Sequence, residues 1–217
     1  MISFDLPLLT SFAAAGMLLA TFVLVSRMRL TSFLFAFRAQ SLFLALYATL
    51  IAFNSGELHL LIIAVLVVAL KVVMLPYLLS AVAQRSGAAL RLESFLRPAT
   101  LSFAGAVAIV FGFIIAEALA PAGQAPFFIG VSLSLLLAGF LLLIARKDLF
   151  AGTIGFLVME NGIFTFGLAL VGGMPLLVEI GIFFDVMISF ILMVTILYRV
   201  QHEHASLATE DLTELTD

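Results

Sequence analysis

Long apolar runs, each about 20 residues in length, dominate the sequence and decide the solvent in which it can fold. We count seven of these runs, at roughly 7–26, 31–53, 58–80, 99–120, 126–145, 149–172 and 175–198. Each run matches the hydrocarbon thickness of a bilayer, and only a helix satisfies its own backbone hydrogen bonds within a single span. The sequence therefore predicts an all-α integral membrane protein, a bundle of about seven transmembrane helices.

Composition agrees with a chain that faces lipid. Hydrophobic residues make up 64% of the 217 residues and charged residues only 11%, which is too little polar surface to cover a globule in water. Cysteine is absent, which excludes thiolate metal ligands, iron–sulfur clusters and a cysteine nucleophile carried by this chain. We therefore expect no cofactor and no metal, and any redox chemistry to belong to a partner. A net charge of −3 argues against nucleic acid.

Basic residues in the loops all fall on one side of the predicted bundle. They are Arg27, Arg29, Arg85, Arg91, Arg97, Arg146, Lys147 and Arg199. Loops rich in Arg and Lys stay in the cytoplasm, so the pattern predicts an N-terminus outside and a cytoplasmic C-terminus in a multi-pass protein of the cell (inner) membrane. One of these loops, residues 83–98, alternates apolar and charged residues, and we expect it to form an amphipathic helix on the membrane surface, with docking of a partner as the alternative role.

Ionisable residues inside the spans are the candidates for function. They are Arg38, Lys71, Glu117, Glu160, Glu179 and Asp185. A charge at mid-bilayer costs about 3 kcal/mol on insertion scales, so each needs a partner, a proton or water. Glu160 and Asp185 fall near the middle of their helices, Lys71 and Arg38 in the inner halves, and Glu117 and Glu179 near the outer ends. Such a series of depths is typical of a proton or sodium path.

Small residues and a proline accompany these charges. Gly152, Gly155 and Gly162 have a spacing that lets another helix approach the sixth span closely. Pro76 frees a backbone carbonyl next to Lys71, which offers an acceptor near a buried amine, although an ordinary kink is an equal alternative.

A family resemblance rests on "LLLIARKDLFAGTIGFLVMENGIF" at residues 141–164 and "MPLLVEIGIFFDVMISFILMVTILYRV" at 174–200. These segments resemble the component E family of hydrogenase-4-type, energy-converting hydrogenase complexes, and the last three spans resemble the K subunit of respiratory complex I. The resemblance divides the chain into a four-helix region at 1–120, a three-helix region at 126–199 and an acidic cytoplasmic tail at 200–217.

The same resemblance implies roles for individual residues. Arg146 and Lys147 match the basic pair of a cytoplasmic loop, and Glu160 matches the carboxylate of the middle span. Either Glu179 or Asp185 is the counterpart of the third-span carboxylate, and the distance from Arg199 favours Asp185. The implied role is a non-catalytic membrane subunit in the ion-translocating arm of a redox complex, beside antiporter-like and quinone- or hydrogenase-module subunits.

Two other functions remain open at the level of sequence. The chain could serve a multisubunit cation/proton antiporter, or it could be a structural membrane anchor in which the buried carboxylates form ion pairs with Lys71 or Arg38. An intramembrane enzyme is not expected, because no nucleophile or metal constellation is found in the sequence.

Overall fold

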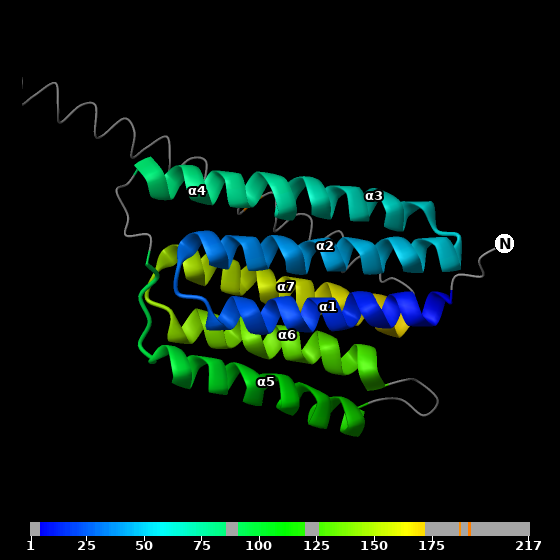
Figure 1. The fold of residues 1–217 in the computed structure, drawn as a ribbon. Helices are drawn as coiled ribbons and strands as arrows, with labels where there is room; N and C mark the ends of the chain where they lie inside the picture. The colour runs from blue at the N-terminus through cyan, green and yellow to red at the C-terminus, as the bar shows by residue number, and fades with distance from the viewer. Residues whose placement is uncertain (1–4, 86–90, 120–125, 172–186, 188–190, 192–217) are drawn as a thin grey trace, which may run out of the picture.

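The fold comes from a computed structural model, which describes residues 5–85, 91–119 and 126–171 together with residues 187 and 191 (Figure 1). Its named elements are α1 (Leu6–Ser26), α2 (Leu30–Ser55), α3 (Leu58–Val67), η1 (Val68–Met74), α4 (Leu75–Arg85), α5 (Pro98–Leu119), α6 (Pro126–Ala145) and α7 (Leu149–Val171). Six helices in this part of the chain are long and apolar enough to cross a membrane. The first six predicted runs are thereby confirmed as apolar helices of membrane-spanning length, whereas the run at 175–198 lies almost wholly outside the described residues.

The helices lie side by side as an antiparallel bundle (Figure 1). Helix α2 packs against α1 and against the third span, α6 packs between α5 and α7, and α1 also contacts α5 and α6. The turns between α1 and α2, between α2 and α3 and between α6 and α7 are short. Gly56 ends α2 with a positive φ of 73° and donates its N–H to the carbonyl of Ala52, a conformation that glycine adopts without steric cost.

Helices α6 and α7 approach closely through glycines from both helices. A Cβ at Gly139 would lie 2.6 Å from the carbonyl oxygen of Gly155, and one at Gly162 would lie 2.7 Å from that of Ser132. The predicted close approach of a helix to Gly155 and Gly162 therefore exists. The prediction was wrong for Gly152, where an added Cβ would meet nothing within 4 Å.

The third span changes its helical pitch in its middle. An α-helical segment leads into the π-helix η1, which contains Lys71, and α4 follows. The N–H of Leu75 bonds to the carbonyl of Leu70, five residues earlier, as a π-helix requires. Pro76 lies in the first turn of α4. Because it has no N–H, it cannot donate a backbone hydrogen bond to the turn before it, where the helical pitch changes. π-Helical turns in α-helices are frequent at functional sites.

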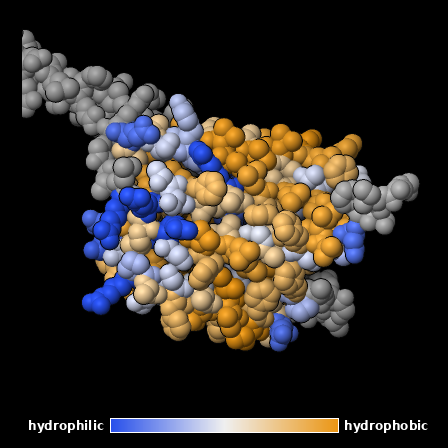
Figure 2. Space-filling view, viewed as in Figure 1, coloured by the Kyte–Doolittle hydropathy of each residue, from blue (hydrophilic) through white to orange (hydrophobic). Residues whose placement is uncertain are grey.

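Three loops meet at one end of the bundle, where hydrophilic residues gather (Figure 2). Residues 91–97 are not the predicted amphipathic helix but a largely extended segment. The segment forms an isolated β-bridge between Arg91 and Arg29 and another between Ser94 and Arg146. Backbone groups of the neighbouring loops bond to its N–H and C=O groups, which removes the need for a helix. The basic residues of these loops thus share one end, and the assignment of this end to the cytoplasm stays a prediction.

Candidate functional site

A buried ion pair lies between η1 and α7. Nζ of Lys71 is 3.0 Å from Oε1 of Glu160, and their side chains are only 2% and 9% exposed. Lys71 comes from the π-helical turn of the third span, and Glu160 is 11 residues past the start of α7, about 16 Å along that helix. Two residues that are 89 positions apart in the sequence are therefore paired deep within the predicted membrane region.

Polar side chains continue from this pair across the bundle to α1. Lys71 Nζ donates to Oδ1 of Asn161 at 2.8 Å, and Asn161 Nδ2 lies 3.4 Å from Oε1 of Gln40. Gln40 Nε2 donates to the hydroxyl of Thr21 at 3.0 Å, and that hydroxyl donates to a backbone carbonyl in α1. Asn161, Gln40 and Thr21 are all fully buried. One hydrogen-bonded chain thus connects η1, α7, α2 and α1.

The direction of these hydrogen bonds follows from the charge of Lys71. An ammonium group can only donate, so Asn161 presents its oxygen to Lys71 and its amide nitrogen to Gln40. Gln40 is then oriented with its oxygen toward Asn161 and its nitrogen toward Thr21. Asn161 fixes the position of the amine and Gln40 fixes the orientation of Asn161, while the carboxylate beside the amine can exchange a proton with it. The arrangement can hold a proton in either of two forms, an ammonium–carboxylate pair or a neutral amine and acid.

Of the six predicted site residues, the structure brings only Lys71 and Glu160 together within the part of the chain that it describes. Arg38 is exposed on the side of α2, and Glu117 is exposed near the end of α5. Arg38 was expected to need a partner inside its span, but its side chain is exposed, whereas Ser41 on the same helix is buried. Glu179 and Asp185 lie outside the described residues.

Arg146, expected only as a loop residue, instead fastens the end of α1. Its Nη2 donates to the carbonyls of Val25 at 3.1 Å and Arg27 at 2.5 Å, and its guanidinium carbon lies 5.5 Å from the ring centre of Phe33. Burial lowers the pKa of the Arg146 guanidinium below its usual value, and the carboxylate of Asp148 partly offsets this effect. A cation at a helix C-terminus satisfies carbonyls that have no partner in the helix.

Lys147 points to a different loop residue. Its Nζ lies 4.9 Å from the ring centre of Phe95, and its backbone N–H donates to the carbonyl of Glu93 at 3.2 Å. The basic pair of this loop therefore holds neighbouring loops together in the structure.

Gln40, Thr21 and Asn161 were not among the predicted site residues. Gln40 and Asn161 were visible in the sequence as amides inside apolar runs, which is a usable signal because buried amides need partners. Thr21 carried no such signal. A threonine hydroxyl in a membrane helix bonds to its own backbone as readily as to another helix, and Thr21 does both.

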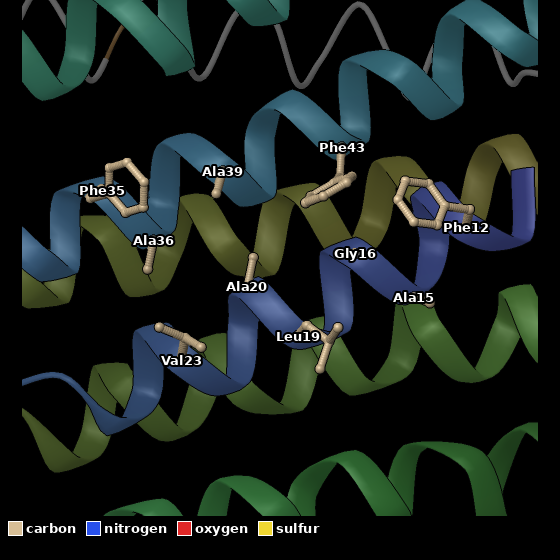
Figure 3. Close-up of a pocket in the computed structure, with 10 residues that line it drawn as sticks. All are labelled: Phe12, Ala15, Gly16, Leu19, Ala20, Val23, Phe35, Ala36, Ala39 and Phe43. Atoms are coloured by element: carbon tan, nitrogen blue, oxygen red, sulfur yellow. The ribbon is translucent and has the colours of Figure 1, made fainter. Parts of the chain in front are cut away.

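The described residues hold no cluster of three or more His, Cys, Asp or Glu side chains that could bind a metal ion. A groove of about 400 Å³ lies between α1 and α2 (Figure 3). It is lined by Phe12, Ala15, Gly16, Leu19, Ala20, Val23, Phe35, Ala36, Ala39 and Phe43. Every one of these is apolar, so the groove offers no group that would orient a polar substrate.

Comparison with known proteins gives a distant relative. The chain is 25% identical over 216 residues to the uncharacterized protein Rv0085 of Mycobacterium tuberculosis, and the match covers 98% of each chain. No protein-family model matches the chain, and no solved structure matches it significantly. The relative's name states no activity, so any functional conclusion depends on the residues of the site.

Proposed function

We propose that this chain is a non-catalytic membrane subunit of a redox-driven, ion-translocating complex of the hydrogenase-4 or complex I type. In this proposal, Lys71 and Glu160 form one relay of its ion path. The observation that carries the proposal is their buried pair at 3.0 Å, in which Lys71 lies on a π-helical turn and also bonds to Asn161. Buried ionisable groups inside a membrane are rare and mark ion pathways more often than they stabilise a fold.

The geometry of the pair favours a proton over a sodium ion. Nζ of Lys71 lies within 3.0 Å of both Glu160 Oε1 and Asn161 Oδ1, which is where a bound cation would have to contact these oxygens. Two cations about 4 Å apart repel each other by about 4 kcal/mol at an effective dielectric constant of about 20. A sodium ion could therefore use this carboxylate only after Lys71 had moved or lost its proton. A proton needs neither change, because it binds to the pair itself.

A structural membrane anchor is the second candidate, and the same ion pair favours it. A buried pair can persist without ever exchanging a proton, since removal of either partner leaves an uncompensated charge. The two candidates differ in what they require of Glu160. A relay requires that its proton leave and return, whereas an anchor requires only that its charge be matched.

Purification in a mild detergent, followed by identification of the co-eluting subunits, tests the assignment to a complex. Nickel- or iron–sulfur-containing partners would support the redox-driven complex. Partners limited to antiporter-like membrane subunits would instead assign the chain to a cation antiporter complex. A chain that elutes alone and is stable would contradict both assignments.

A further inference from the structure

Arg38 is a charged residue on the outer surface of the predicted membrane region. It lies eight residues past the start of α2, about 12 Å along the helix, and its side chain is exposed. It makes no hydrogen bond or ion pair with any part of the chain that the structure describes. Lys71, the other basic residue deep in a described span, is buried and paired. A counter-charge for Arg38 therefore has to come from outside the described residues.

A groove begins one helical turn beyond Arg38 on the same face of α2. Arg38, Leu42, Ala45 and Thr49 follow one another at spacings of three and four residues, which places them in a single stripe of the helix. The groove has a volume of about 680 Å³ and lies between α2 and the third span. It is lined by Leu42, Ala45, Leu46, Thr49, Leu61, Ala64, Val65, Val68 and Ala69.

We propose that this groove binds a transmembrane helix of another subunit, and that this helix presents an Asp or Glu carboxylate to Arg38. The alanines and the threonine leave room for a second helix backbone, as small residues do at helix contacts in membranes. A guanidinium pairs with a carboxylate through two parallel hydrogen bonds, which fixes the register of the incoming helix. The inference adds a partner surface to the proposed function and does not depend on which ion the complex moves.

A helix fits this surface better than a phospholipid or a second copy of the chain. From Arg38 the groove runs away from the basic end of the bundle and into the apolar interior, whereas a lipid phosphate belongs at the membrane surface. A symmetric dimer would bring the same patch from both copies together. The groove lining contains no carboxylate, so a second copy could not supply the missing charge from this patch.

The groove also shares a wall with the candidate functional site. Val68 and Ala69 belong to η1 and line the groove, while Lys71 of the same π-helical turn is buried toward α7. A helix seated in the groove would therefore contact the segment that positions Lys71. Movement of the partner helix would then change the position of Lys71 relative to Glu160.

Photo-cross-linking in the native membrane tests the occupant without disturbing Arg38. A photoreactive amino acid replaces Leu46, which is 41% exposed in the groove, and a control chain carries it at Phe103, which is 71% exposed on α5. We expect the photoreactive residue at position 46, and not the one at position 103, to cross-link to a peptide of another protein. That peptide should belong to a membrane span that contains an Asp or Glu. A lipid adduct, a product of twice 23.3 kDa made of two copies, or equal cross-linking of that peptide from Phe103 would overturn the proposal.

Charge substitution tests the role of Arg38. Arg38→Glu should lower the yield of the Leu46 cross-link about tenfold or more, since it places two like charges together. Arg97→Glu makes the same change on an exposed loop arginine and should leave the yield unchanged. Exchange of the identified partner carboxylate for Arg should restore the cross-link in the Arg38→Glu chain, which separates lost pairing from misfolding.

Two results would refute the ion pair of Arg38. One is an equal cross-linking yield from the unaltered chain and from the Arg38→Glu chain, and the other is a failure of the exchanged pair to restore the yield. Either result leaves the Lys71–Glu160 proposal to be judged by its own test.

Discussion

Arg146→Met should destabilise the bundle by loosening the end of α1. Methionine keeps an unbranched apolar stem but leaves the carbonyls of Val25 and Arg27 without the hydrogen bonds that the guanidinium donates at 3.1 and 2.5 Å. Hydrogen bonds to a charged group contribute about 1.5 to 3 kcal/mol each, and the contact with Phe33 adds about 0.5 to 1 kcal/mol. Because burying the guanidinium also has a cost, we expect a net loss of about 3 kcal/mol in the free energy of unfolding.

Thermal melting followed by circular dichroism measures this loss. The chain has no Trp and no Cys, so tryptophan emission and thiol-reactive dyes do not serve here. For a chain of this size a loss of about 3 kcal/mol corresponds to a fall of roughly 6 to 12 °C in Tm. Lys147→Met is the matched control, since it removes only a contact with one aromatic ring, and it should lower Tm by no more than about 4 °C. An Arg146→Met chain that melts within about 2 °C of the unaltered chain would refute the role of Arg146 as a helix cap.

Three further predictions concern the pair, the helix crossing and the topology. The double variant Lys71→Met/Glu160→Gln should lose less free energy of unfolding than the sum of the losses of the two single variants, and additive losses in the melts would exclude the pair. Gly139→Leu should lower the free energy of unfolding by at least about 1 to 3 kcal/mol, because a Cβ there lies 2.6 Å from an α7 backbone oxygen. Gly152→Ala is the control and should melt at the wild-type temperature, because a Cβ there meets nothing within 4 Å. A reporter fused after Asp217 should be active only in the cytoplasm, and activity on the outside would reverse the predicted orientation.

The helical spans could be predicted from the sequence because lipid leaves the backbone few choices. An apolar run of about 20 residues has to form a helix in a membrane, and the described helices follow the first six runs closely. The extended segment at 91–97 could not be predicted in the same way. Its alternation of apolar and charged residues fits a surface helix, and its actual conformation depends on backbone groups of two distant loops.

The candidate site could be predicted in its parts but not in its pairing. The cost of a buried charge singled out Lys71 and Glu160, yet nothing in the sequence tells which of the charges in different spans lie against each other. Arg38 and Lys71 looked alike as basic residues in the inner halves of their spans. They differ in the helix face on which they lie. Lys71 points into the bundle and pairs with Glu160, whereas Arg38 points away from the bundle. Those faces follow from how α2 and η1 pack, which no local pattern specifies.

The central claim is that the carboxyl group of Glu160 takes up and releases a proton during turnover. Replacing Glu160 by Gln preserves its shape and its capacity for hydrogen bonds but removes its ionisation. The measurement is ion pumping by the purified complex in sealed vesicles, with the amount of assembled complex determined in the same preparation.

The proposal predicts normal assembly with impaired pumping for Glu160→Gln and partial pumping for Glu160→Asp, which keeps an ionisable group on a shorter stem. Loss of the assembled complex in the Gln variant would instead identify a static pair whose remaining amine is left without its counter-charge, at a cost of about 3 to 5 kcal/mol. Full pumping by a well-assembled Glu160→Gln complex would show that the carboxylate is dispensable and would contradict the relay.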